Sequence, residues 1–391
     1  MNKIIIEKEK LEFNINAIKD QAKIGKISGE DQIEPRIIAV LKANAYGIGT
    51  ELMSKVLIEN GVDFFAVTDV SEAVKLRKYA SDKKILVLNS TCIEDEVKQI
   101  VDNNLIASCG SFESIDILEK MSKKLNKKSA FHLNIDTGMS RFGFRADELL
   151  KAPLDISDEE KNELLLNKLT KKIKELEFAK IEGIYTHFQE SYAKDAARTK
   201  EQFSEFVNVM NKFKEKEVDV GLKHCCNTSA FFKFPYMHLD AVRVGSAFSG
   251  RAQLEIAKKL KRVGYLESDI CEIRQLKAGD RVFYSGMFTA KNDMKVGVVQ
   301  AGYADGFELS GPQDNFRAIH KLRQMKNAFI SLFKDTNNYV EINGKKKKVL
   351  GRIGMKNFVV DLTDVDANVG DKVKISIPLS LTNNLVEREL I

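Results

Sequence analysis

The stretch from Arg36 to Val70, RIIAVLKANAYGIGTELMSKVLIENGVDFFAVTDV, contains the unit from which the fold can be predicted. It begins and ends with short runs rich in β-branched and aromatic residues, RIIAVLKA and DFFAVTDV. Between these runs, GTELMSKVLIENG has the apolar spacing of an amphipathic helix and ends at a glycine. A strand, a helix and a second strand in this order predict a βαβ unit with parallel strands.

The same alternation continues from about residue 35 to about residue 250. Further runs that predict strands are KILVLNS, LIASCG, FHLNIDTG, KIEGIYTHF, KHCCNTSA and LDAVRVG. About eight such units fit a closed (β/α)8 barrel of the TIM type, and no GxGxxG follows the first strand to indicate an open dinucleotide-binding sheet. We therefore expect an α/β protein in which residues 1–248 form this barrel.

Beyond Gly250 the sequence changes to short apolar runs separated by Gly-Asp and Asn-Gly turns. This pattern predicts a mostly β C-terminal domain over residues 249–391, with which the first ten or so residues of the chain can pair. We expect the basic run GKKKKV, from Gly344, to be a solvated hairpin tip. Two interruptions remain, an elaborated connection over residues 155–172 and an added helix over residues 315–335.

The composition argues against several classes of function. The 391 residues include 62 Lys and Arg against 56 Asp and Glu, and the basic residues are dispersed, so nucleic acid is not an expected partner. Five cysteines without CxxC spacing or paired histidines argue against a disulfide framework and a metal site. No apolar run has the length of a signal peptide core or a membrane span. We expect a cytoplasmic protein with no membrane partner.

Several polar residues directly follow predicted strands. Because the active site of a TIM-type barrel lies at the carboxyl ends of its strands, these residues are the first candidates for chemistry. Each one alone is more often a hydrogen-bonded structural residue. The candidates are Lys42, Asp136, His187, Asn227, Thr228 and Arg243.

Lys42 has two interpretations. Its stem can lie on the core while its ammonium group stays in water, which is the usual behaviour of lysine. Alternatively, burial lowers its pKa, and the neutral amine becomes a nucleophile that condenses with an aldehyde cofactor. The segment ANAYG that follows favours the second interpretation, because small residues let a ring approach the backbone and Tyr46 offers a hydroxyl to an anion.

AVLKANAYGIG resembles the pyridoxal-phosphate lysine segment of the alanine racemase family. The resemblance extends in order along both predicted domains, through HLNIDTGMSRFGF, GIYTHFQES, HCCNTSAFF, LDAVRVGSAFSG, GDRVFYSG, AGYADGF and GRIGM. It implies an isomerase that interconverts L- and D-alanine, the latter a cell-wall precursor, with pyridoxal 5'-phosphate as cofactor. It also implies a homodimer in which each active site is shared between the subunits.

The resemblance assigns the catalytic roles to two residues. Lys42 would bind the cofactor and act as the base on one face of the substrate Cα, and Tyr284 would act on the opposite face. Racemisation needs an acid or base on each face, so two groups from two domains make chemical sense. An aromatic residue of the β-domain core is the structural alternative for Tyr284.

The remaining roles also come from the resemblance. Arg243 would face the pyridine nitrogen of the cofactor and keep it unprotonated, with His187 orienting Arg243. The substrate carboxylate would be held by Arg141 and the backbone amide of Met355. The phosphate would be bound by Tyr46, Thr228 and the backbone amides around Gly245 and Ser246. Asn227 would complete the cofactor site.

Some positions depart from the family pattern. Asn134 stands where many members have a lysine, often carbamylated, that balances the arginine equivalent to Arg141. At the substrate entrance Lys356 replaces an acidic residue, and Pro378 falls at the position of a tyrosine. The entrance residues that limit which substrates fit are therefore altered, so a racemase for serine or for a broader set of amino acids is the close alternative.

Two other classes remain to be separated from a racemase. A decarboxylase of the related barrel fold would need an acidic partner for the pyridine nitrogen, where this chain has Arg243. A small barrel protein that binds pyridoxal phosphate without racemase activity would lack the C-terminal β domain.

Overall fold

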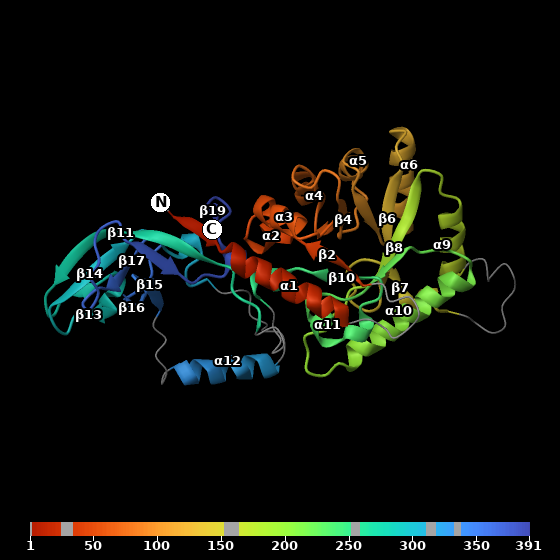
Figure 1. Cartoon of the computed structure of the whole chain (residues 1–391). Coiled ribbons are helices and arrows are strands. Elements are labelled where there is room, and N and C mark those ends of the chain that lie inside the picture. Colours follow the sequence, from red (N-terminus) through yellow and green to blue (C-terminus); the bar gives the residue numbers. More distant parts are fainter. Residues whose placement is uncertain (1, 25–33, 152–163, 252–258, 310–317, 332–337) are drawn as a thin grey trace. The chain divides into compact units, whose positions relative to one another are not determined.

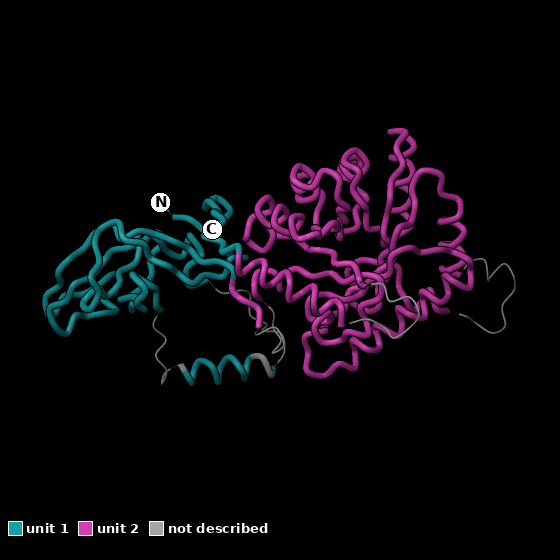
Figure 2. Tube along the Cα trace, in the orientation of Figure 1, with its two compact units in different colours: residues 1–8, 263–391 teal, residues 9–262 magenta. Residues whose placement is uncertain are grey.

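The computed structural model describes residues 2–24, 34–151, 164–251, 259–309, 318–331 and 338–391 (Figure 1). These residues form two compact units. One consists of residues 9–262, and the other combines residues 1–8 with residues 263–391 (Figure 2). Each unit is described below by itself.

The larger unit contains a closed barrel of parallel strands. The strands pair in the order β5-β4-β3-β2-β10-β9-β8-β6, and β5 also pairs with β6, which closes the ring. The predicted TIM-type barrel is therefore confirmed. Its strands are β2 (Arg36–Val40), β3 (Phe64–Val67), β4 (Lys84–Val87), β5 (Ile106–Cys109), β6 (Ser129–Asp136), β8 (Ala179–Tyr185), β9 (Leu222–His224) and β10 (Ala241–Val244).

Helices follow the strands, as the alternation in the sequence predicts. The longer helices of this unit are α1 (Lys8–Ile24), α3 (Thr50–Glu59), α4 (Val70–Arg77), α5 (Glu94–Asp102), α6 (Phe112–Lys124), α9 (Leu165–Lys174) and α10 (Ala197–Glu215). Shorter elements are β7 (Phe144–Arg145), α7 (Ala146–Leu149) and α11 (Thr228–Lys233). Of the predicted connection over residues 155–172, residues 155–163 lie outside the described residues, and α9 begins at Leu165.

Alternate residues of the strands fill the inside of the barrel. Ile38 and Val40 of β2 pack with Phe64 and Ala66 of β3 in one buried cluster. Because side chains alternate along a strand, the residues between them face the helices. A filled barrel of this kind leaves the carboxyl ends of the strands as the place where polar side chains can converge.

The second unit is built on a mostly antiparallel sheet. Its strands pair in the order β14-β17-β16-β15-β18-β11-β1-β19, and β14 also pairs with β11. These strands are β1 (Lys3–Ile6), β11 (Gly264–Leu276), β14 (Met294–Val299), β15 (Tyr339–Ile342), β16 (Lys345–Leu350), β17 (Phe358–Asp361), β18 (Lys372–Ile375) and β19 (Glu387–Leu390). A two-stranded ribbon joins β12 (Arg281–Val282) to β13 (Phe288–Thr289), and the helix α12 spans Ala318–Ser331.

The amino terminus belongs to this β-rich unit. Strand β1 lies between β11, with which it is antiparallel, and β19, with which it is parallel. Ile4 and Ile6 of β1 are fully buried. Strand β1 is therefore an integral part of the unit formed by residues 263–391.

One prediction for this unit was wrong in part. Asn343 and Gly344 do form the turn of a hairpin between β15 and β16, but the lysines that follow are not all solvated. The side chain of Lys347 is only 6% exposed and forms an ion pair with Asp364. Lys347 points to the buried face because side chains alternate along β16, and the paired carboxylate makes its burial tolerable.

Candidate active site

The structure brings most of the predicted cofactor residues to one end of the barrel. Lys42 follows β2, His187 follows β8, and Arg243 lies near the end of β10. Since these strands are parallel members of the same closed ring, all three residues lie at its carboxyl-end face. The residues that join them there are Tyr46, Asn227, Thr228, Gly245 and Ser246.

The turn that carries Lys42 has an unusual backbone. The segment labelled α2 (Lys42–Tyr46) winds in the left-handed sense, because four successive residues, Ala43 to Tyr46, have φ between 52° and 54°. This conformation costs about 1–2 kcal/mol per residue for residues other than glycine. Such backbone persists only where surrounding contacts hold it, and it is concentrated at functional sites.

The charges around Lys42 act on its pKa in opposite directions. Desolvation lowers the pKa of Lys42, and the nearby guanidinium of Arg141 lowers it further, while the carboxylate of Glu72 acts to raise it. A lowered pKa increases the fraction of neutral amine at pH 7, which is the form that attacks an aldehyde. Lys42 itself is exposed in the single chain, so the direction of this pKa shift agrees with the reactive interpretation but reflects only partial desolvation.

Tyr46 lies against the backbone of the loop after β10. A Cβ atom added to Gly245 would meet the Tyr46 hydroxyl at 2.5 Å, so only glycine fits here. Desolvation, and then the charge of Glu72, raise the pKa of Tyr46 to about 12, so the phenol keeps its proton and can donate it to an anion. The hydroxyl of Thr228 accepts a hydrogen bond from the Gly245 amide at 3.1 Å. Two hydroxyls and the amides that begin the turn at Ser246 thus form a compact donor set of the kind that binds phosphate.

Asn227 has a structural task that its predicted role did not include. Its side-chain oxygen caps α11 by accepting from the Ala230 amide at 3.1 Å, and it also accepts from the Ser191 hydroxyl at 2.7 Å. Asn227 therefore fixes the start of the helix whose first residue is Thr228.

Arg243 is buried and held by several acceptors. Its Nη1 donates to Nδ1 of His224 at 2.7 Å, and its Nη2 donates to the carbonyl oxygen of Thr186 at 2.8 Å. The contact from Nη2 to Nδ1 of His187 is longer, at 3.5 Å. Among the described residues these bonds use Nη1 and Nη2, so Nε remains available to an acceptor in the barrel mouth. The ring of Tyr185 lies under the guanidinium group, 5.1 Å from its carbon.

Sequence reasoning did not identify His224 and His132 as parts of this network. Nδ1 of His224 accepts from Arg243, so Nε2 carries the proton and donates to Nδ1 of His132 at 2.8 Å. Burial holds the pKa of His224 well below its usual value and lowers the pKa of His132 to about 3, so both rings stay neutral. Gly183 in β8 makes room for this pair, because a Cβ atom there would meet the His132 ring at 2.6 Å.

Arg141 lies on a loop that Asp136 organises. One carboxylate oxygen of Asp136 accepts from the amides of Gly138 at 2.9 Å and Ser140 at 3.0 Å. The Arg141 side chain is exposed, whereas Asn134, on the strand before the loop, is buried. Asp136 was a candidate from its place at a strand end, and the structure shows what it does.

Tyr284 and Met355 belong to the β-rich unit. Both are exposed, Tyr284 by 70% and Met355 by 59%, so Tyr284 is not part of the core of its own unit. The residues on either side of Tyr284 have positive φ, 61° at Phe283 and 62° at Ser285. This strained turn lifts Tyr284 out of the β12–β13 ribbon.

The altered entrance positions gather within the β-rich unit. The ammonium group of Lys356 donates to the carboxylate of Asp305 at 2.7 Å, and Asp305 is almost fully buried. The turn containing Asp305 also contacts the turn after Pro378, since a Cβ atom at Gly306 would meet the Thr382 methyl at 2.9 Å. Lys356 is therefore the counter-ion of a buried carboxylate.

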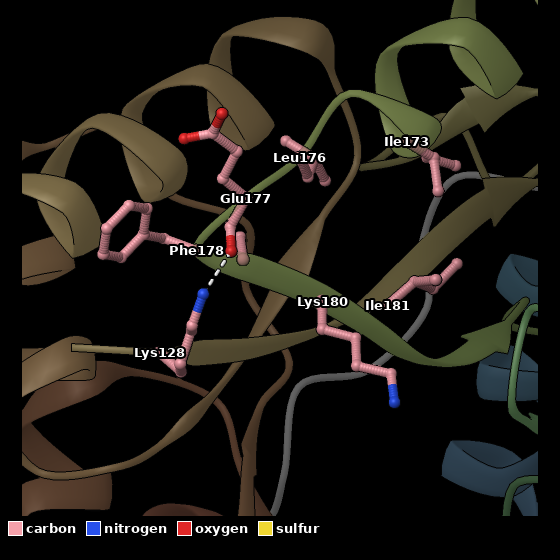
Figure 3. A pocket seen from close by; sticks show the side chains of 8 residues that line it. Lys128, Ile173, Leu176, Glu177, Phe178, Lys180 and Ile181 are labelled. Carbon is pink, nitrogen blue, oxygen red and sulfur yellow. Dashed lines mark hydrogen bonds between the residues drawn. The ribbon is translucent and has the colours of Figure 1, made fainter.

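Hollows at the other end of the barrel do not carry this chemistry. One of about 340 Å³ lies where β6 and β8 begin, lined by apolar residues and the stems of Lys128 and Lys180 (Figure 3). There Lys128 donates to the carbonyl oxygen of Glu177 at 2.5 Å. Because Lys42 follows the carboxyl end of a parallel strand, this hollow and the candidate site lie at opposite ends.

The donor set at the carboxyl ends fits pyridoxal phosphate. The site offers an amine with a lowered pKa, an arginine whose Nε has no partner among the described residues, and hydroxyls around a glycine that tolerates no side chain. These groups match the aldehyde, the pyridine nitrogen and the phosphate of the cofactor. Lys42, Arg243 and the Tyr46–Thr228 pair are the residues that would hold these three groups.

Comparisons with known proteins agree with both units. The family pattern described as "Alanine racemase, N-terminal domain" matches residues 6–253, and that described as "Alanine racemase, C-terminal domain" matches residues 263–384. An alanine racemase of Methanococcus maripaludis is 31% identical over 370 residues, which cover 93% of this chain and 87% of the relative. Alanine racemase 2 of Caldanaerobacter subterraneus is 28% identical, covering 95% and 86%.

A solved structure with the same fold leads to the same family. The alanine racemase of Clostridium difficile 630 superposes with a TM-score of 0.79 at 26% identity, covering 100% of this chain and 95% of that one. Within the described residues, no helix has the length and apolar character to cross a membrane. On both domain matches and on its fold, this chain belongs to the alanine racemase family.

Proposed function

We propose that the protein is a pyridoxal-phosphate-dependent alanine racemase that interconverts L- and D-alanine with two bases. The observation that carries the proposal is the convergence of Lys42, Arg243 and the Tyr46–Thr228 donor set at the carboxyl ends of β2, β9 and β10. Relatives that are named alanine racemases and match over most of both chains support it.

When bound, the cofactor would supply electron withdrawal that makes the substrate Cα proton acidic. Lys42 would hold the cofactor until substrate displaces it, and its Nζ would then take or return the Cα proton on one face. Its lowered pKa suits this task, because the neutral amine can act as a base near pH 7.

Arg243 would keep the pyridine nitrogen unprotonated. Nδ1 of His224 accepts from Nη1, which fixes the guanidinium plane, and the neutral His187 beside it adds no competing charge. An unprotonated pyridine nitrogen withdraws electron density less strongly than a protonated one. This difference disfavours decarboxylation and transamination relative to proton transfer. Arg243 therefore also argues against the decarboxylase alternative.

Tyr284 of the partner subunit would complete the site from the opposite face, and Arg141 and the Met355 amide would hold the substrate carboxylate. The exposure of Tyr284, Met287 and Met355 supports a surface that is covered on dimerisation. The proposal also includes a cytoplasmic location and a role in D-alanine supply.

A racemase of broader range is the second candidate. The ion pair of Lys356 with Asp305 and the loss of a hydroxyl at Pro378 change the entrance positions, which favours acceptance of side chains larger than methyl. Incubation of the holoenzyme with a panel of L-amino acids and chiral detection of products separates the two. Preferred turnover of alanine supports the proposal, whereas strong turnover of serine with weak turnover of alanine replaces it with the second candidate.

A further inference from the structure

Glu72 contacts the turn that carries Lys42. This residue lies in the first turn of α4, where the side chain of Asp69 caps the helix by accepting from the Glu72 amide at 3.0 Å. The cap fixes the backbone of Glu72, so the direction of its side chain is set by the start of the helix. None of the predicted catalytic or cofactor roles involves this residue.

The two oxygens of the Glu72 carboxylate have different partners. Oε1 accepts from the backbone amide of Ala43 at 2.6 Å. Oε2 accepts from the amide of Thr68 at 3.3 Å and from its hydroxyl at 3.0 Å. The carboxylate therefore links the residue after Lys42 to the end of β3, and both oxygens serve as acceptors for N–H groups.

Ala43 is also the first of the four left-handed residues. The hydrogen bond from its amide to Glu72 is therefore made where the chain leaves β2 and enters the left-handed turn. A strained turn needs contacts that over-determine it, and a charged acceptor on its first amide is a strong contact of this kind.

We propose that Glu72 is a positioning residue that clamps the left-handed turn and thereby aims Lys42 at the cofactor aldehyde. This inference rests on the proposed function, because it takes Lys42 as the lysine that binds pyridoxal phosphate. The carboxylate also has an electrostatic effect, since its charge opposes that of Arg141 and acts to raise the pKa of the Lys42 amine.

The clamp makes a specific prediction about a conservative change. In Glu72→Gln the side chain keeps its shape but has one oxygen, so either the Ala43 or the Thr68 amide loses its acceptor. We expect the affinity of the cofactor-free chain for pyridoxal phosphate to fall about tenfold or more, in line with the loss of one charged hydrogen bond. Glu113→Gln is the matched control, because Glu113 is an exposed acid in the first turn of another barrel helix, α6.

Rescue by glycine distinguishes a clamp from a general loss of stability. Glycine adopts positive φ without the Cβ penalty, so Ala43→Gly in the Glu72→Gln background should restore most of the cofactor affinity. If Glu72 only stabilised α4, glycine at position 43 would not help. A failure of this rescue, or an unchanged affinity in Glu72→Gln, would overturn the proposal.

The pH dependence gives an independent readout. The rate at which the cofactor-free chain takes up pyridoxal phosphate follows the neutral fraction of Lys42, so loss of the Glu72 charge should move its midpoint to lower pH. Thr68→Val keeps the charge and should leave the midpoint in place; a midpoint that moves equally in both variants would contradict the role of the carboxylate. If Lys42→Ala still bound the cofactor covalently, the proposed function itself would fail, and that result is separate from the outcomes above.

Discussion

The buried histidine pair makes the barrel unit sensitive to acid. His132 is 1% exposed and its neighbour His224 is fully buried, and no carboxylate contributes to the shift of either ring. Burial, and then the charges of Lys84 and Arg243, lower the pKa of His132 to about 3. The unfolded chain binds a proton on the same ring near pH 6.5, so stability is full above that pH and is lost as the pH falls.

The magnitude follows from linkage. Between pH 7.5 and 5.5 a ring with a folded pKa of about 3 and an unfolded pKa of about 6.5 loses about 1.4 kcal/mol of unfolding free energy. Burial also lowers the pKa of His187 to about 3, so the two rings together account for about 3 kcal/mol. The lowered pKa of His224 adds to this loss in the same pH window.

Urea unfolding at the two pH values measures this effect. In His132→Gln we expect the pH-dependent loss to be smaller by about 1.4 kcal/mol than in the native chain, whatever the variant does to stability at pH 7.5. Phe64→Leu is the control, because Phe64 packs edge-on against the His132 ring at 5.9 Å but does not titrate. It should lower stability equally at both pH values. An identical pH dependence in His132→Gln and the native chain would refute the reasoning.

Substitutions of Lys42, Tyr284 and Lys356 test their proposed roles separately. Lys42→Ala should abolish racemisation and the absorbance band of lysine-bound cofactor; persistence of the band would remove Lys42 from its role. Tyr284→Phe should retain cofactor but lower turnover by about 10²–10⁴-fold, measured by chiral chromatography, because one general acid-base is lost; normal turnover would exclude Tyr284. Lys356→Met should cost about 1–3 kcal/mol of unfolding free energy by leaving the buried Asp305 without its cation, and Asp305→Asn in the same chain should recover most of it. If the double variant is no more stable than Lys356→Met, the ion pair does not have this role.

The barrel and the β domain could be predicted because their patterns are local. An amphipathic helical pattern separates the apolar runs RIIAVLKA and DFFAVTDV, and the structure has β2, α3 and β3 at these three places. The places of Lys42 and Arg243 could be predicted for the same reason, since each lies at or near the end of an apolar run. Their proposed roles came from the resemblance to a family.

The contacts between neighbouring strands were beyond prediction from the pattern. His224 is the last residue of β9 and Arg243 lies 19 positions later, so their hydrogen bond depends on the pairing of β9 with β10. The one signal available was that both lie at strand ends. The Glu72 bond to Ala43 depends in the same way on the pairing of β2 with β3.

Backbone strain was also hidden from the sequence. Nothing in the residues of ANAYG predicts four successive left-handed residues, because this conformation is imposed by contacts from elsewhere in the chain. The same holds for the positive φ of Phe283 and Ser285 on either side of Tyr284. The prediction that Lys347 is solvated was wrong because four lysines in a row give no sign of which side chains face inward.

The most direct test of the central claim is racemisation of L-alanine by the holoenzyme in D2O, with the isotope content of both enantiomers measured early in the reaction. With Lys42 and Tyr284 acting on opposite faces, D-alanine should form with deuterium at Cα while the remaining L-alanine keeps its protium. Absence of D-alanine would contradict the proposed activity. D-alanine that retains the original protium would contradict the two-base account.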